Sequence, residues 1–320
     1  MRIFVTGAAG FIGFAVVKEL IAAGHQVTGL ARSAASGKKL IDAGARVQLG
    51  SVDDLECLRR AAAVADGAVH MAFYHKVSHI PLGKRVGLFL GGAPRGIVQR
   101  FMIAAVETDR RALKTIGQSL AGSDRPLVAP FATMAMRQGQ LATEDESYDP
   151  TFFAAPRAET ENLLQELASS GVRTSAVRLP PIVHGAGDQG LTPMLIKIAR
   201  KKKESGYVGD GLNRWPSVHC LDAARLFRLA LENGVGGGTY HGVAEEGIPF
   251  RHIADLIGEH LNVPVVSKSV AEAGKQFSFL TQFVLRDNPT SSKLTQERLG
   301  WKLTHQGLLK DLGDADYFKG

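Results

Sequence analysis

Residues 2–13 read RIFVTGAAGFIG, a short apolar run followed at once by three glycines spaced three apart. Residues 14–23 continue with apolar side chains at helical spacing, and Gly24 ends that pattern where a residue without Cβ is favoured. Residues 26–31, QVTGLA, have the composition of a second strand. A strand, a glycine loop, a helix and a strand within about thirty residues are typical of a dinucleotide-binding unit.

Each glycine of the loop has a physical role in such a unit. Gly7 permits the tight turn after the strand, Gly10 lets backbone N–H groups approach a pyrophosphate, and Gly13 lets the helix pack closely on the strand. The pyrophosphate lies on the positive end of the helix, so Phe11 and Ile12 belong to the same predicted cofactor site. The alternative is a glycine-rich turn that binds no ligand.

The end of the second strand selects the cofactor. NAD sites place an acid there to bond the ribose 2′-hydroxyl, but residues 31–33 read Ala-Arg-Ser with no acid nearby. Arg32 can pair with a 2′-phosphate through charge-assisted hydrogen bonds, with Ser33 beside it. We therefore predict NADP rather than NAD. The alternative for Arg32 is a solvated loop arginine.

The alternation of strands and helices continues along the chain. Further strands are predicted at residues 45–50, 67–72, 126–129 and 174–179, with helices between them such as 54–65 and 103–120. The pattern predicts an α/β fold with a doubly wound parallel sheet and a smaller C-terminal substrate lobe. The predicted dinucleotide-binding domain covers residues 1–180, completed by about 217–233, and the predicted substrate lobe covers 181–216 and 234–320.

The composition favours a soluble globular protein. The 320 residues are 45% hydrophobic, and two cysteines exclude a disulfide framework. No apolar stretch reaches the ~18 residues of a membrane span, and no signal-peptide pattern is present, so a cytoplasmic location is expected. The net charge of +7 lacks the interleaved aromatics of a nucleic-acid site and suits an anionic cofactor or substrate. No metal site is predicted, and a monomer or homodimer is expected.

Residues 6–13, TGAAGFIG, resemble the TGxxGxxG motif of the extended short-chain dehydrogenase/reductase superfamily, which includes the nucleotide-sugar epimerases and dehydratases. Later segments agree with that superfamily in order along the whole chain: residues 50–54 (GSVDD), 69–72 (VHMA), 178–185 (RLPPIVHG), 209–211 (GDG), 217–224 (SVHCLDAA) and 297–301 (ERLGW). The resemblance implies further cofactor contacts, to the adenine, to the phosphates and ribose, and to the nicotinamide. The residues are, in that order, Ser51 and Val52; Met71, Ala72 and Phe73; and Leu179, Pro180, Pro181, Ile182 and Val183.

The superfamily's active site is a Tyr-x-x-x-Lys pair, and this chain departs from it. None of the five tyrosines has a lysine four residues later. Alignment on residues 158–164 places Phe153 at the tyrosine position and Arg157 at the lysine position. Phenylalanine cannot donate a proton, and Pro156 is expected near the start of the helix rather than inside it. The pattern resembles atypical members that keep the nucleotide motif without the catalytic pair.

Other groups must then support the chemistry. Thr133 is the hydroxyl that follows the predicted fifth strand, and it either bonds a substrate oxygen or caps a backbone N–H. Tyr74 follows the predicted fourth strand, where a substrate could lie. Arg157 can hold a ribose hydroxyl of the cofactor. His184 and His219 are further candidates for the proton donor, because histidine titrates near neutral pH.

The predicted function is an NADP-dependent oxidoreductase that reduces a carbonyl, or oxidises an alcohol, on a small organic substrate. Positioning of cofactor and substrate would provide much of the catalysis. The segment 74–106 is either a lid over the substrate or a surface insertion. Two alternatives stay open, a non-enzymatic NADP-binding sensor and a lyase or isomerase that retains its cofactor.

Overall fold

The computed structural model describes residues 1–81, 85, 97–152, 155–314 and 316–319. The chain divides into two compact units. Unit 1 contains Met1–Phe131, Pro150–Ala176 and Phe227–Gly238, and unit 2 contains Ala132–Asp149, Val177–Leu226 and Thr239–Gly320.

Strands and helices alternate along the part of the chain that builds unit 1, which is the pattern that the sequence predicts. In chain order these elements are β1 (Arg2–Thr6), α1 (Phe11–Ala22), β2 (Gln26–Ala31), α2 (Ala34–Asp42), β3 (Arg46–Leu49), α3 (Leu55–Ala63), β4 (Gly67–His70), η1 (Val77–His79), α5 (Ile97–Leu120), β5 (Pro126–Ala132), α6 (Ala155–Ala158), α7 (Thr160–Ser169) and β6 (Arg173–Leu179).

Unit 2 is built mainly from the second half of the chain. Its elements are η3 (Thr133–Ala135), β7 (Ile182–His184), α8 (Leu191–Lys202), β8 (Ser205–Val208), β9 (Arg214–His219), α9 (Cys220–Asn233), β10 (Gly238–His241), β11 (Glu245–Pro249), α10 (Phe250–Leu261), β12 (Val265–Lys268), α11 (Val270–Phe277), η4 (Ser278–Leu280), α12 (Thr281–Val284), α13 (Lys293–Leu299), α14 (Leu308–Asp314) and η5 (Asp316–Phe318). The boundary between the units runs through β5, β6, α9 and β10.

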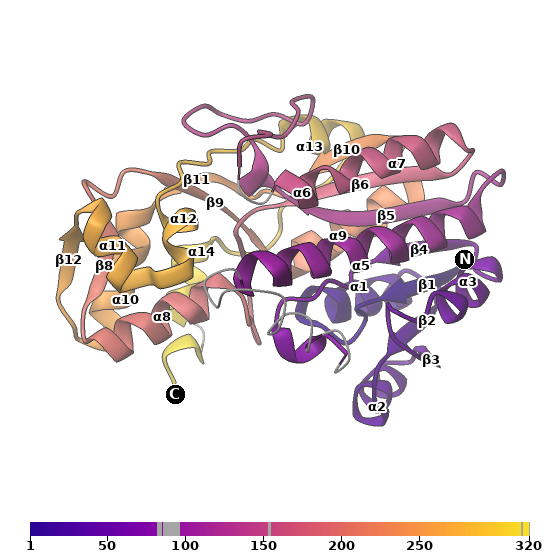
Figure 1. The fold of residues 1–320 in the computed structure, drawn as a ribbon, viewed down its shortest axis with the longest axis horizontal. Helices are drawn as coiled ribbons and strands as arrows, with labels where there is room; N and C mark the ends of the chain where they lie inside the picture. Colours follow the sequence, from indigo (N-terminus) through magenta and orange to yellow (C-terminus); the bar gives the residue numbers. More distant parts are fainter. Residues whose placement is uncertain (82–84, 86–96, 153–154, 315, 320) are drawn as a thin grey trace. The chain divides into compact units, whose positions relative to one another are not determined.

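One sheet has seven strands in the order β10-β6-β5-β4-β1-β2-β3, and helices flank it (Figure 1). The pairings of β1 with β2 and β4, of β2 with β3, and of β4 with β5 are parallel. The chain runs outward from β1 to β3 and then returns to β4 on the other side of β1. Such a reversal puts the ligand crevice beyond the carboxyl ends of β1 and β4. The predicted α/β fold with a doubly wound parallel sheet is confirmed.

Of the segment expected at about 217–233 to complete the first domain, the helical part from Phe227 belongs to unit 1, whereas the strand segment lies outside the seven-stranded sheet. That segment is β9, which pairs with β7 in parallel and with β11 in antiparallel in a three-stranded sheet. The seventh strand of the large sheet is β10 instead. Strand pairing depends on partners far along the chain, and the local composition of β9 does not reveal them.

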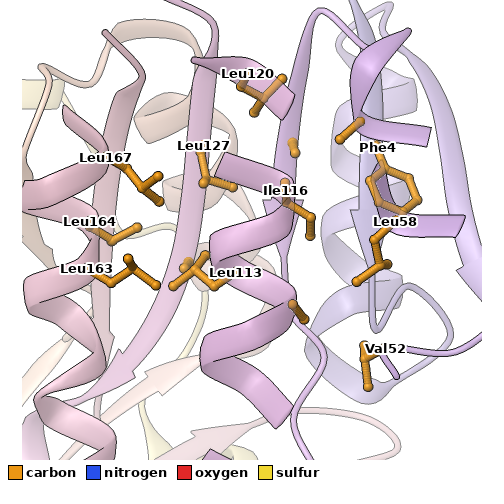
Figure 2. Packing of buried hydrophobic residues seen from close by; sticks show 14 of the residues in the cluster. Phe4, Val52, Leu58, Leu113, Ile116, Leu120, Leu127, Leu163, Leu164 and Leu167 are labelled. Carbon is orange, nitrogen blue, oxygen red and sulfur yellow. The ribbon is translucent and has the colours of Figure 1, made fainter. Parts of the chain in front are cut away.

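The hydrophobic core of unit 1 lies between the sheet and helices α3, α5 and α7 (Figure 2). Full burial of each large aliphatic side chain in such a core contributes about 1.5–3 kcal/mol. Helix α5 begins at Ile97, six residues before its predicted start, and Phe101 in the added residues packs against the same core. Helices α5 and α7 contribute leucines and an isoleucine to this core: Leu113, Ile116 and Leu120 of α5, and Leu163, Leu164 and Leu167 of α7.

Candidate cofactor-binding and active site

The loop between β1 and α1 is tight at two of its glycines. Gly7 has φ +62°, and a Cβ there would lie 2.7 Å from the backbone nitrogen of Ala72 and 2.7 Å from the carbonyl carbon of Met71. A Cβ on Gly13 would lie 2.2 Å from the carbonyl oxygen of Gly7. Only a hydrogen fits at these two positions, so the loop is held against the end of β4 and against α1.

The loop leaves the start of α1 open to an anion. Gly10 is the N-cap residue, no side chain caps the helix, and its first turn contains no acid. Gly10 donates its N–H to the carbonyl of Gly7 at 3.0 Å, and this bond closes the turn. A helix N-terminus with this geometry attracts a phosphate through its dipole and its amide groups. The residues present therefore fit the pyrophosphate of a dinucleotide.

Two cations lie at the end of β2 and on the helix after it. Arg32 is exposed, and its Nη1 lies 3.4 Å from the carbonyl oxygen of His79. Ser33 accepts a hydrogen bond from the N–H of Ser36 at 3.2 Å and so caps α2. Lys39 of that helix donates to the carbonyl of Ala9 in the glycine loop at 3.2 Å.

Lys39 is a residue that the sequence analysis missed. Its ammonium also lies 4.0 Å from the centre of the Phe14 ring, so two contacts hold it beside the loop. The available signal was the Ser33-x-x-Ser36 capping pattern, which starts a helix and places Lys39 in its second turn. Unit 1 thus brings two cations, Arg32 and Lys39, to the nucleotide loop region.

The predicted adenine residues form a turn after β3. The hydroxyl of Ser51 accepts a hydrogen bond from the N–H of Asp53 at 3.1 Å, and Val52 is buried. Tyr74 is also buried, and its hydroxyl donates to the carboxylate of Asp53. Burial, and then the bond to Asp53, raises the pKa of Tyr74. The Tyr74 hydroxyl is therefore already engaged inside unit 1.

A buried hydrogen-bond chain runs under the end of β4. Thr6 accepts from the N–H of Ala72 at 3.2 Å and bonds Nδ1 of His70 at 2.8 Å, and Nε2 of His70 bonds Asp109 at 3.2 Å. The Asp109 carboxylate accepts from Nε2, so Nδ1 accepts from Thr6 in the neutral ring. This chain fixes the start of the Met71–Phe73 segment, whose three residues are half-buried.

Arg157 lies against that segment. Helix α6 begins at Ala155, next to Pro156, and carries the Arg157 guanidinium to 3.8 Å from the centre of the Phe73 ring. Burial lowers the pKa of Arg157, and the charge of Asp109 opposes that change. Its Nε is buried and has no hydrogen-bond partner among the residues that the structure describes. Phe153, aligned with the superfamily's tyrosine, lies outside the described residues.

Thr133 belongs to unit 2. It lies in η3, is fully buried, and donates its hydroxyl to Oδ1 of Asn288 at 3.0 Å. The side chain of Asn288 donates in return to the backbone carbonyl of Thr133 at 2.9 Å. The two residues thus satisfy one another.

The residues predicted beside the nicotinamide also belong to unit 2. Leu179 ends β6, and Ile182 and Val183 lie in β7, paired with Ser217 and Val218 of β9. Pro180 and Pro181 form the turn between the two strands.

The two candidate histidines of unit 2 have internal contacts as well. Nδ1 of His184 bonds Asp311 at 2.8 Å, and the ring of His219 stacks on that of His305 with centres 4.4 Å apart. Of the predicted lid, residues 82–84 and 86–96 lie outside the described residues.

Known proteins are similar to this chain in sequence and in fold. Residues 3–81 match the model of the NAD dependent epimerase/dehydratase family. A Schizosaccharomyces pombe relative, uncharacterized protein C2A9.02, is 46% identical over 99% of this chain and 100% of its own length. A 2-alkyl-3-oxoalkanoate reductase of Stenotrophomonas maltophilia is 27% identical over 85% of this chain and 79% of its own. The crystal structure of a Streptomyces venezuelae dTDP-glucose 4,6-dehydratase with NAD bound has a TM-score of 0.75 at 20% identity, covering 100% of this chain and 97% of that one.

The chain belongs to the NAD dependent epimerase/dehydratase family, within the extended short-chain dehydrogenase/reductase superfamily. Members of this family bind NAD(P) cofactors, and the relatives of this chain include reductases. No helix in the described ranges is long and apolar enough to cross a membrane. Among the same residues, no group of three or more His, Cys, Asp or Glu side chains is placed to hold a metal ion.

Proposed function

We propose that this protein is an NADP-dependent oxidoreductase that reduces a carbonyl, or oxidises an alcohol, on a small organic substrate. The observation that carries the proposal is a pair of cations: Arg32 follows the end of β2, where NAD sites have an acid, and Lys39 of α2 lies beside the glycine loop. Residues 31–41 contain no acid, and Asp42, the first one after them, pairs with Lys38 at 2.8 Å. A 2′-phosphate would supply the missing negative charge.

The residues of unit 1 divide the work of holding the cofactor. The glycine loop and the start of α1 would bind the pyrophosphate, Arg32 and Lys39 the 2′-phosphate, and Ser51 and Val52 the adenine. Met71, Ala72 and Phe73 would border the ribose and phosphates, and in unit 2 Leu179–Val183 would border the nicotinamide. When bound, the nicotinamide supplies or accepts the hydride.

The substrate oxygen needs a polar partner as its charge develops. Of the two predicted hydroxyls, Thr133 is the better candidate, because its bond to Asn288 joins two neutral groups. The bond of Tyr74 to the Asp53 carboxylate is charge-assisted, and such bonds are roughly twice as strong as neutral ones. Release of the Thr133 hydroxyl toward a substrate therefore costs less than release of the Tyr74 hydroxyl.

One observation favours a second candidate function. Both predicted catalytic hydroxyls already have internal partners, Asp53 for Tyr74 and Asn288 for Thr133. A protein that binds NADP as a sensor needs a cofactor-binding site but no proton donor. The lyase or isomerase alternative has no such observation in its favour.

NADPH oxidation over a panel of ketones, aldehydes and oxo acids tests the proposal. We expect turnover of at least one compound with NADPH, and a lower kcat/KM with NADH. Binding of NADPH without turnover of any compound would favour the sensor, and turnover with NADH at equal efficiency would contradict the assignment of NADP.

A further inference from the structure

The guanidinium of Arg157 is held in place without being fully satisfied. Its guanidinium carbon lies over the Phe73 ring, 3.8 Å from the ring centre, and this cation–π contact holds the group beside the ring. Its Nε is buried without a hydrogen-bond partner in the described part of the chain. A buried N–H donor that lacks an acceptor costs free energy, so the hydrogen-bonding capacity of this guanidinium is not fully used within the described residues.

The charge of Arg157 is compensated only in part. Among the described residues, Asp109 is the acid whose charge raises the pKa of Arg157 against the effect of burial. That carboxylate is shared, because one of its oxygens accepts from Nε2 of His70 at 3.2 Å. Desolvation, and after it the charge of Arg157, lowers the pKa of His75 to about 4, so His75 is neutral at pH 7 and adds no cation. A permanent cation thus lies beside one shared carboxylate.

The position of Arg157 places it next to the predicted cofactor segment. Its stacking partner Phe73 directly follows Ala72, whose backbone nitrogen lies against Gly7 of the glycine loop. An anion bound at Arg157 would therefore lie close to the segment that borders the cofactor. All of these groups belong to unit 1.

We propose that Arg157 binds a carboxylate of the substrate, so that the substrates are oxo acids and the products hydroxy acids. A carboxylate has two oxygens that match the fork of a guanidinium, and its charge compensates the half-buried cation, which a neutral ribose hydroxyl does not. That the bound acid is also a substrate rests on the proposed reductase function. Binding of a carboxylate at Arg157 does not require turnover and can be tested separately from it.

Calorimetry on the full chain saturated with NADP⁺ tests the site without a reaction. The probes are a set of α- and β-oxo acids, acetoacetate among them, each paired with its methyl ester. We expect at least one acid to bind about tenfold or more tightly than its ester. We expect Arg157→Gln to abolish that preference and Arg157→Lys to keep part of it. Arg111→Gln, which changes an exposed arginine of α5, is the matched control and should keep the full preference.

Three results would overturn the proposal. These are binding of no acid in the set, equal binding of acids and esters by the parent, and an unchanged preference in Arg157→Gln. In the last case, a Kd for NADP⁺ raised about tenfold in Arg157→Gln would assign the arginine to the cofactor instead. Circular dichroism establishes that Arg157→Gln is folded, and Arg157→Lys serves alone if it is not. If acids bind through Arg157 but no compound of the ketone, aldehyde and oxo-acid panel is reduced by NADPH, the proposed function fails and the carboxylate site stands.

Discussion

The nucleotide loop and the two predicted catalytic hydroxyls differ in how their polar groups are used. At the loop, the start of α1 has no side-chain cap and no acid in its first turn. Tyr74 and Thr133, by contrast, are buried and donate to Asp53 and Asn288. A helix start that no side chain caps suits an anionic ligand, whereas engaged hydroxyls must first break a bond.

The region proposed to bind the cofactor thus differs from the hydroxyls proposed to act in catalysis. The backbone of Gly7 and Gly13 fixes the loop against the end of β4 and against α1, so the proposed dinucleotide site needs no rearrangement there. The hydroxyls are arranged to stabilise the fold around them. A catalytic role for either one therefore depends on a local rearrangement, and substitutions in the two regions should have unequal effects.

The largest effect is expected at the loop. In Gly10→Val, a Cβ would lie 3.2 Å from the carbonyl of Gly7, a contact that a small shift relieves, while the rest of the side chain occupies the pyrophosphate position. We expect the Kd for NADPH to rise by about a hundredfold or more, which is roughly 3 kcal/mol, with the fold intact. Fluorescence titration with NADPH measures it. Gly274→Ala, at a position with nothing within 4 Å, should bind normally. Normal binding by Gly10→Val would mean that the loop is only a turn.

The cations after β2 should give the next effect. Arg32→Ala removes a charge-assisted contact. It should weaken the binding of NADPH by about ten- to a hundredfold, or 1.5–3 kcal/mol, and leave the affinity for NADH unchanged. Lys39→Ala should weaken NADPH in the same direction, since its ammonium lies at the loop. Arg46→Ala, an exposed arginine at the start of β3, is the control. If NADPH binding is unchanged in Arg32→Ala, that arginine is only solvated.

Thr133 tests whether an engaged hydroxyl still acts in catalysis. Thr133→Ala should lower turnover by about ten- to a hundredfold if the hydroxyl holds the substrate oxygen, the scale of one lost polar contact of ~1.4–2.7 kcal/mol. Thr133→Ser should keep most activity.

Asn288→Ala provides the matched control, because it removes the same internal bond and leaves the Thr133 hydroxyl in place. Steady-state kinetics on the variants compare kcat. An equal loss in Asn288→Ala would show that the effect is structural, and parent-like turnover of Thr133→Ala would make Tyr74 the next candidate.

The smallest effect on turnover is expected from Tyr74→Phe, within about twofold, because the hydroxyl serves Asp53. Its stability should fall by about 1–3 kcal/mol, since Asp53 loses a buried donor. The pKa of Tyr74 is raised in the fold, so the native protein binds more protons than the unfolded chain above about pH 10. Parent stability should therefore decrease as the pH rises through that range. The decrease should be smaller in Tyr74→Phe, where the raised pKa of Tyr317 still contributes to it. Urea unfolding at several pH values measures both, and a pH-independent difference would contradict the raised pKa.

The features predicted from the sequence are those whose causes are local. Strands β1 and β2 have the predicted bounds, because an apolar run, a glycine and a helical pattern are read from neighbouring residues. The Tyr74–Asp53 and Thr133–Asn288 bonds could not be predicted, because their partners lie 21 and 155 residues apart in the chain. Lys39 was not predicted as part of the site, because helix α2, which carries it, was not predicted from the sequence. Pairings and side-chain contacts over such separations are set by the packed fold.

The proposed function requires that the loop and the two cations beside it bind NADP. Titration calorimetry of the unmodified protein with NADPH and with NADH, at one ionic strength, tests it most directly. We expect NADPH to bind at least about tenfold more tightly than NADH, and the difference in affinity to decrease as salt is added. Equal affinities, or tighter binding of NADH, would contradict it.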